Sequence, residues 1–139
     1  MNWITTDIDK VNQLNRNTLM ETLDIKCVAV HDNIVEMTMP VSPKNHQPMG
    51  LLHGGASVAL IESVGSLGSA LLIDTRKEAC VGLEVNANHL NAVKTGMVRA
   101  IAEIIHCGRR THVWKVDVID EETKKMVCTG RLTVMIIQR

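Results

Sequence analysis

Glu62 is the only charged residue in a run of aliphatic, small and hydroxyl side chains that extends from residue 54 to residue 73. This composition predicts a helix that is buried on most of its surface. A buried carboxylate costs free energy unless it is paired with a cation, protonated or used in a reaction. Two interpretations follow: Glu62 forms an ion pair with a core arginine or lysine, or it acts in catalysis.

A histidine and two glycines, His53, Gly54 and Gly55, stand where this helix should begin. The first amides of a helix have no acceptor inside it, and the helix dipole places partial positive charge there. Glycine also lets another group approach the backbone closely. The helix start could therefore bind an anion or an oxyanion. The alternative is that the glycines serve only the turn.

The distance between these two features favours a site that two chains share. Gly54 and Glu62 lie ~12 Å apart along a helix, whereas an oxyanion donor and a catalytic carboxylate must converge to within ~3 Å of one carbon. The lean of side chains toward the helix N-terminus recovers only part of this distance. We infer a homodimer with antiparallel central helices, in which Glu62 comes from one subunit and Gln47, His53 and Gly54 come from the other.

The remaining chain predicts an α+β fold in which a curved antiparallel sheet wraps one central helix. Short helices are expected near residues 6–14, with Thr6 as N-cap, and near residues 18–23. An irregular loop rich in proline is expected at residues 42–53. Strands are expected at residues 25–31, 34–41, 80–90, 97–106, 113–119 and 126–137.

Three details of these elements can be compared directly with a structure. Alternation should place Val35, Met37, Met39 and Val41 on one face of their strand. In residues 80–90 the same rule groups four aliphatic residues on one face: Val81, Leu83, Val85 and Ala87. In the central helix, Gly65 and Gly68 should leave room for another backbone to approach.

Length and composition exclude several classes of function. The 139 residues correspond to a single domain spanning 1–139, and 45% of them are hydrophobic. The 15 Lys and Arg residues balance the 15 Asp and Glu residues, so no basic excess indicates a nucleic-acid partner. The absence of Phe and Tyr leaves almost no aromatic surface on which bases could stack.

The cysteines and histidines outside the helix start show no spacing typical of a metal site. We therefore expect no metal, free thiols and a reducing cytoplasmic location for the four cysteines: Cys27, Cys80, Cys107 and Cys128. No signal peptide is visible, and the glycines and serines around Glu62 favour a soluble helix over a membrane span. Three histidines are expected to be surface or structural residues: His31, His46 and His112.

The motifs resemble those of the hotdog-fold acyl-CoA thioesterases of the PaaI type. The resemblance rests on QPMGLLHGGA at residues 47–56, ESVGS at residues 62–66, VGLEVNANH at residues 81–89 and the Trp114 strand. It covers nearly the whole chain. Within the family, the sequence is most similar to the clade that hydrolyses aromatic acyl-CoA thioesters, including the dihydroxynaphthoyl-CoA thioesterases of menaquinone synthesis.

The resemblance implies a role for each catalytic candidate. Glu62 matches the catalytic carboxylate, which acts as nucleophile or as base toward water. Gly54 matches the backbone donor that polarises the thioester carbonyl. Gln47 and His53 match residues that position the thioester, and Ser66 matches a hydroxyl that orients water or the acyl group.

The resemblance also implies where coenzyme A binds. Arginines at a turn suit phosphate groups, although a turn with two arginines is also compatible with a simple solvated turn. Relatives can be basic at the position of Asn91 and can carry a small hydroxyl at the position of Arg109, so we expect the phosphate contacts to be distributed differently in this chain. The matching substrate-binding residues are Gly82, His89, Leu90, Asn91, Ala92, His106, Cys107, Gly108, Arg109, Arg110 and Thr111.

The sequence therefore predicts a homo-oligomeric acyl-CoA thioesterase, as a homodimer or a dimer of dimers. The expected substrate is an aromatic or medium-chain acyl-CoA, 1,4-dihydroxy-2-naphthoyl-CoA among them, and an acyl carrier protein could present the same thioester. No cofactor is expected, because coenzyme A is part of the substrate. The alternatives are a hotdog dehydratase or hydratase, which spaces its histidine and acid differently and lacks His-Gly-Gly, and a non-catalytic acyl-CoA-binding protein.

Overall fold

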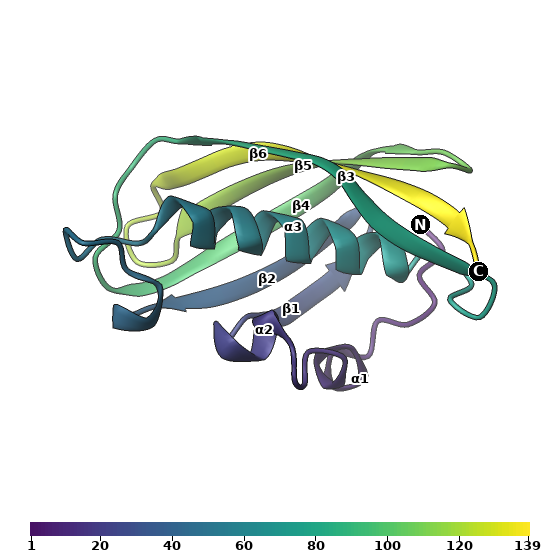
Figure 1. Cartoon of the computed structure of the whole chain (residues 1–139), viewed down its shortest axis with the longest axis horizontal. Helices are drawn as coiled ribbons and strands as arrows, with labels where there is room; N and C mark the ends of the chain where they lie inside the picture. The colour runs from purple at the N-terminus through teal and green to yellow at the C-terminus, as the bar shows by residue number, and fades with distance from the viewer.

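The computed structural model describes all 139 residues. One long helix packs against one antiparallel sheet (Figure 1). The sheet has six strands in the order β1-β2-β4-β5-β6-β3. This arrangement confirms the predicted α+β architecture. The helices are α1 (Ile8–Gln13), α2 (Leu19–Thr22) and α3 (Gly54–Ala70), with a 3-10 helix at Pro43–Asn45. The strands are β1 (Lys26–His31), β2 (Ile34–Val41), β3 (Glu78–His89), β4 (Gly96–Cys107), β5 (Thr111–Asp120) and β6 (Met126–Gln138).

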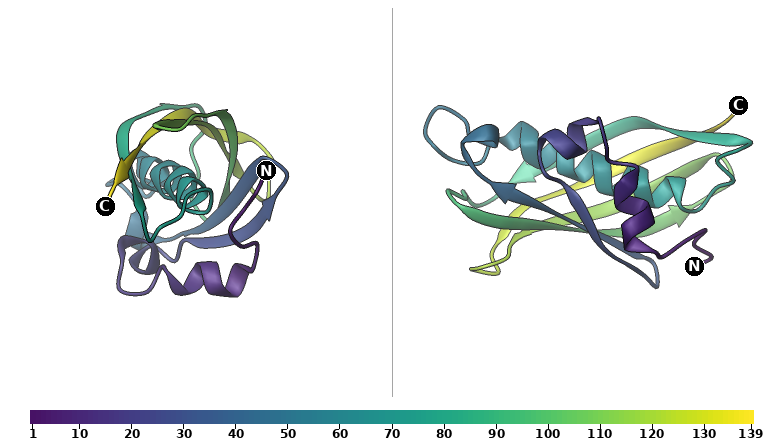
Figure 2. Two further views of the ribbon diagram at one scale, coloured as in Figure 1. Left: turned by 90° about the vertical axis from the view of Figure 1, so that its right-hand side faces the viewer. Right: turned by 90° about the horizontal axis from the view of Figure 1, so that it is seen from below.

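The sheet curls around α3, as the end-on view in Figure 2 shows. Its inner face supplies most of the hydrophobic core together with one side of α3. The predicted alternation is confirmed in β2, where Val35, Met37, Met39 and Val41 are all buried. Period-two alternation therefore identifies the face of the sheet that meets the helix.

Trp114 on β5 fills the space that two glycines of α3 leave open. A Cβ at Gly68 would overlap the far edge of the Trp114 ring, and a Cβ at Gly65 would lie 2.6 Å from Leu132 Cδ2. The Trp114 Nε1–H group donates a hydrogen bond of 2.9 Å to Ser69 Oγ. The prediction that a backbone approaches these glycines is thus wrong, because side chains of the sheet occupy that space.

Two helix boundaries differ from the sequence prediction. Asp7, and not Thr6, caps α1, since the Asp7 carboxylate accepts hydrogen bonds from the N–H groups of Asp9 and Lys10. The central helix ends at Ala70, three residues before Ile73. No helix of the chain combines the length and the apolar character that crossing a bilayer requires.

A β-bulge changes the inward face of β3 halfway along the strand. The pairing with β6 shifts between Gly82 and Glu84, which leaves Leu83 as the extra residue. Before the bulge, Cys80 faces the helix and its thiol donates to the Ser66 carbonyl at 3.6 Å. Val81 and Leu83 are instead 42% and 53% exposed, so the prediction that they share one face with Val85 and Ala87 is wrong.

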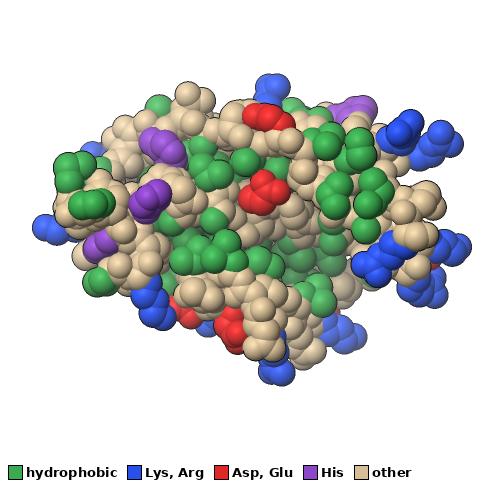
Figure 3. All heavy atoms as spheres, viewed as in Figure 1, with side chains coloured by type: hydrophobic (Ala, Val, Ile, Leu, Met, Phe, Trp, Pro, Cys, Tyr) green, Lys and Arg blue, Asp and Glu red, His purple; other side chains and the backbone are tan.

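One side of α3 and the free edge of β3 have no partner within the chain. β3 is the last strand of the sheet, and Val58, Ala59, Glu62 and Ser66 of α3 are only half-buried. Figure 3 shows hydrophobic side chains gathered over the middle of this face and Lys and Arg side chains at the end where the C-terminus lies. The sheet therefore wraps the helix incompletely.

Candidate active site

The start of α3 leaves one backbone N–H group free. The N–H groups of Ala56 and Ser57 donate to the His53 carbonyl at 2.9 and 3.3 Å. The Gly55 N–H group donates to His53 Nδ1 at 2.8 Å. The Gly54 N–H group has no acceptor within the chain. A single donor with helix-dipole polarity is thus left at Gly54.

His53 caps the helix through its ring as well as its carbonyl. Because Nδ1 accepts a hydrogen bond from Gly55, the proton of the neutral imidazole must lie on Nε2. The side chain is exposed, and the backbone N–H group of His53 is held by the Asn45 carbonyl at 2.8 Å. His53 can therefore donate one hydrogen bond through Nε2 from a fixed position.

A pocket of about 320 Å³ lies beside Gly54. It joins the catalytic candidates Gln47 and Gly54 to four predicted substrate-binding residues, which are His89, Leu90, Asn91 and Ala92. The His89 ring lies against Gly54, where an added Cβ would be 2.9 Å from Nε2. Sequence reasoning missed the other lining residues, which are Leu51, Leu52, Ser57, Val93 and Val127. Of these, only Ser57 carried a signal, since it lies one turn after Gly54 on the same helix.

Gln47 is held by the tight loop that follows it. Its main chain bonds to Leu51 and Gly50 at 2.8 and 2.9 Å, and Gly50 adopts a φ of 74°, which favours glycine. The Gln47 Oε1 atom accepts a hydrogen bond from the Met49 N–H group. With its oxygen engaged, the Gln47 side chain has its NH₂ group left to donate.

Glu62 lies on the half-open side of α3 against the backbone of Gly82. No cation pairs with it, and burial raises the pKa of its carboxyl group above the ordinary value. The interpretation of Glu62 as half of a core ion pair is therefore wrong. Ser66 lies one turn further along the same helix and is also half-buried.

Gly82 makes room for this carboxylate. An added Cβ at Gly82 would overlap Glu62 Oε1. Although Gly82 was predicted to contact coenzyme A, its contact within the chain is with Glu62.

We expect a Gly82→Ala substitution to displace the Glu62 carboxylate and to lower kcat by ~10²-fold, since a misplacement of ~1 Å can have such an effect. Steady-state kinetics of the catalysed reaction measure the loss. In a double variant with Glu62→Gln, the Gly82→Ala change should add almost nothing, because its target is already absent. Independent, multiplying losses would contradict this account.

The predicted coenzyme A turn at residues 106–111 lies at the opposite end of the sheet. Arg109 and Arg110 line a separate pocket with Glu78 and Gln138. Glu78 and His89 are the two ends of β3, which are ~36 Å apart at ~3.3 Å per residue. One chain therefore does not bring this turn and the segment from His89 to Ala92 together.

Two histidines within the turn region have local roles. Gly108 packs against the His106 ring, where an added Cβ would be 2.6 Å from Nε2. His112 is buried, its Nε2 lies 3.6 Å from Cys107 Sγ, and its Nδ1 has no partner. Burial lowers the pKa of His112, so this ring favours the neutral form. His112 thus matches the expected structural role.

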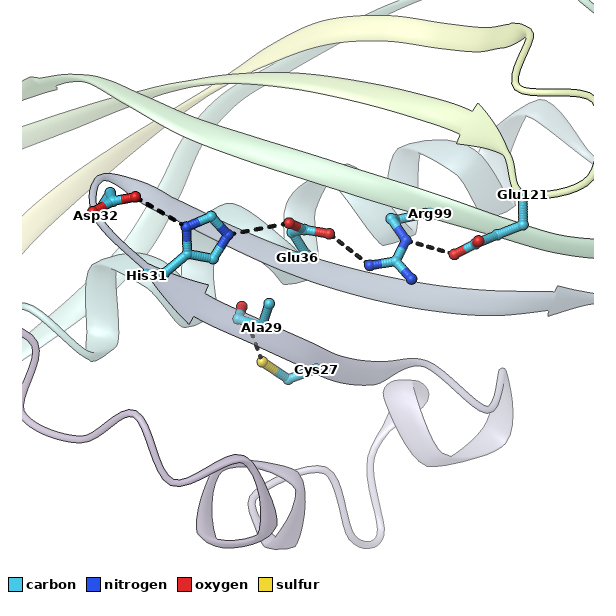
Figure 4. Close-up of polar contacts among 7 residues, drawn as sticks. All are labelled: Cys27, Ala29, His31, Asp32, Glu36, Arg99 and Glu121. Atoms are coloured by element: carbon cyan, nitrogen blue, oxygen red, sulfur yellow. Dashed lines mark hydrogen bonds and ion pairs between the residues drawn. The ribbon is translucent and has the colours of Figure 1, made fainter.

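The most extended ion-pair network lies on the part of the sheet formed by β1, β2 and β4 and includes none of the candidate site residues. Figure 4 shows His31 between Asp32 and Glu36, and Arg99 between Glu36 and Glu121. Burial acts to raise the pKa of Glu36, but the hydrogen bonds with Arg99 and His31 together outweigh it, and the pKa is lowered. These groups are satisfied by one another. No group of three or more His, Cys, Asp or Glu side chains is placed to hold a metal ion.

Comparisons with known proteins extend over nearly the whole chain. The family model described as Thioesterase superfamily matches residues 49–127. A 1,4-dihydroxy-2-naphthoyl-CoA hydrolase of Escherichia coli is 38% identical over 94% of this chain and 94% of its own length. The proofreading thioesterase EntH of Cronobacter turicensis is 40% identical over 94% of this chain and 93% of its own. A crystal structure of a mutant thioesterase from Pseudomonas aeruginosa matches with a TM-score of 0.96 and 43% identity, and covers 100% of both chains.

Proposed function

The chain belongs to the thioesterase superfamily and is a thioester hydrolase with the hotdog fold, and from this premise we propose that its substrate is an aromatic or medium-chain acyl-CoA. The products are the free acid and coenzyme A. The observation that carries this proposal is the unpaired Gly54 N–H group at the start of α3, which lines the same pocket as Gln47, whose NH₂ group is left to donate. Two donors at one pocket suit the oxygen of a thioester carbonyl.

The proposed reaction uses each group for a separate task. The Gly54 N–H group donates to the carbonyl oxygen and stabilises the negative charge that develops there. Gln47 and the Nε2–H group of His53 hold the thioester in place. Glu62 either removes a proton from the attacking water or attacks the carbonyl carbon itself. In both routes the C–S bond breaks and the coenzyme A thiolate leaves. In the second route, water then hydrolyses the anhydride formed between Glu62 and the acyl group, which releases the free acid and restores the carboxylate.

A two-fold dimer supplies the missing proximity between Glu62 and Gly54. Within one chain, Glu62 contacts Gly82 and Gly54 contacts His89. Antiparallel packing that places Glu62 opposite the partner's Gly54 therefore also places Gly82 opposite the partner's His89. That registration pairs the free edges of the two β3 strands and covers the exposed side chains of Val81 and Leu83.

The same registration unites the two halves of the proposed coenzyme A site. Antiparallel β3 edges place the Glu78 end of one strand beside the partner's segment that follows His89. The pocket that contains Arg109 and Arg110 then lies near the pocket that contains the partner's Gly54. Two guanidinium groups at this position suit the phosphates of a coenzyme A whose thioester lies at the other pocket.

The proposal is tested by thiol release from a panel of acetyl-, hexanoyl-, benzoyl- and 1,4-dihydroxy-2-naphthoyl-CoA. We expect hydrolysis of the ring and medium-chain thioesters with a kcat/KM at least ~10-fold above that for acetyl-CoA, because an apolar acyl group adds binding energy. Tight binding without thiol release would instead indicate a non-catalytic acyl-CoA-binding protein. Hydration of an enoyl-CoA without thiol release would indicate a hydratase.

A further inference from the structure

A second groove, of about 280 Å³, lies between α2 and the first half of α3. α2 lies beside this part of α3 in Figures 1 and 2. Leu19 of α2 and the C-cap residue Leu23 form one wall, and Gly55, Ala56 and Ala59 of α3 form the other. The groove owes its width to the small residues on α3, since leucines on both walls would fill it.

The groove adjoins the proposed thioester site at the start of α3. This residue lines the groove, while the next residue, Gly54, lines the pocket that also contains Gln47. A carbonyl oxygen bound at the Gly54 N–H group therefore has the groove on one side and the coenzyme A segment on the other. One substituent of the carbonyl carbon is the sulfur of coenzyme A, so the acyl group is left for the groove.

The apolar part of the groove, formed by Leu19, Leu23, Ala56 and Ala59, fits a hydrocarbon group, and Lys44, Asn45, His46 and His53 form its polar part. The groove is open to solvent, and its volume of about 280 Å³ has room for one ring with substituents or for a chain of similar volume. Leu19 is 56% exposed, which leaves its side chain available to a ligand. The Lys44 and Asp24 side chains lie 3.6 Å apart and connect the 3-10 helix to the end of α2.

We propose that the acyl group lies in this groove and that Leu19 and the C-cap residue Leu23 at the two ends of α2 determine which acyl groups are accepted. The inference rests on the proposed function for the position of the thioester. It assigns selectivity to a four-residue helix that lies outside the catalytic segment. Leu19→Ala and Leu23→Ala remove apolar contact with the acyl group, and Leu19→Trp narrows the groove.

The test measures binding and turnover separately. Dissociation constants are measured for two thioether analogues, S-benzyl-CoA and S-methyl-CoA, which cannot be hydrolysed. We expect Leu19→Ala and Leu23→Ala to raise the dissociation constant of S-benzyl-CoA by ~10-fold and to change that of S-methyl-CoA by less than ~2-fold. Each substitution removes about three methylene-sized groups that contact only the ring. Leu19→Trp should exclude the benzyl analogue alone. The matched control is Leu14→Ala, because Leu14 is 63% exposed and lies outside the groove.

Each result has a defined meaning. The assignment of the groove would be overturned if the ratio of the S-benzyl-CoA to the S-methyl-CoA dissociation constant were the same in all Leu19 and Leu23 variants as in Leu14→Ala. Equal weakening of both analogues would overturn it as well, because it would place α2 against coenzyme A. If the Leu19 and Leu23 variants selectively lose affinity for S-benzyl-CoA but the natural protein hydrolyses no acyl-CoA, the result would support the acyl group's position in the groove and reject the proposed hydrolysis.

Discussion

Replacing Glu62 with glutamine is expected to lower kcat for thioester hydrolysis by at least ~10³-fold, as for loss of a principal catalytic group. Glutamine has the shape of glutamate but can neither accept a proton from water nor attack the carbonyl carbon. Glu62 forms no ion pair that the change would break, and burial disfavours its charged form. The variant should therefore fold and still bind the thioether analogues. Glu84→Gln on the exposed side of β3 is the matched control.

The pH dependence provides a second measurement on the same variant. Burial raises the pKa of Glu62, so the protonated, inactive form persists to a higher pH than for an exposed glutamate. The kcat/KM of the natural protein should fall as the pH decreases through this raised pKa. The residual activity of the Glu62→Gln variant should lack that acid limb. A Glu62→Gln variant whose kcat is within tenfold of that of the natural protein would show that Glu62 is not a principal catalytic group.

Much of the fold follows from local patterns in the sequence. The long apolar run predicts α3 because it is bounded by a glycine-rich start and a polar connection, and the alternation in β2 identifies its buried face. A helix that is apolar on most of its surface requires a covering sheet. These patterns extend over only a few residues, so they can be recognised in the sequence alone.

The bulge in β3 is not predictable in this way. Strict alternation groups Val81 with Val85, but the shift at Gly82 and Glu84 depends on how β3 pairs with β6. Gly82 must approach Glu62 closely, and the contact joins two residues that are 20 positions apart in the sequence. Long-range pairing of this kind leaves no periodic signal.

The candidate site was predictable as a set of residue types but not as an arrangement. His53 and Gly54 predict a helix start. Only the hydrogen bonds of the next three N–H groups, those of Gly55, Ala56 and Ser57, show that Gly54 alone keeps a free N–H group. The separation of the two arginines from the His89 end of β3 also appears only in three dimensions. The same separation within the chain makes the dimer necessary for the proposed site.

The shared site predicts that two inactive variants regain activity when they are combined. A Glu62→Gln chain keeps its own His53, and a His53→Ala chain keeps its own Glu62. In a mixed dimer, one site receives both changes, while the other site receives Glu62 from one chain and His53 from the other. Random exchange at equal concentrations makes about half of the dimers mixed, and one of two sites in each is intact.

The most direct measurement of the shared site is therefore thiol release before and after subunit exchange between these two variants. Exchange is verified by mass spectrometry of differently tagged chains, and each variant incubated alone is the control. If Glu62 acts on a thioester held by the partner's His53 and Gly54, activity will rise to about a quarter of that of the natural protein. Verified exchange with activity no greater than the average of the two separate variants would show that each site lies within one chain.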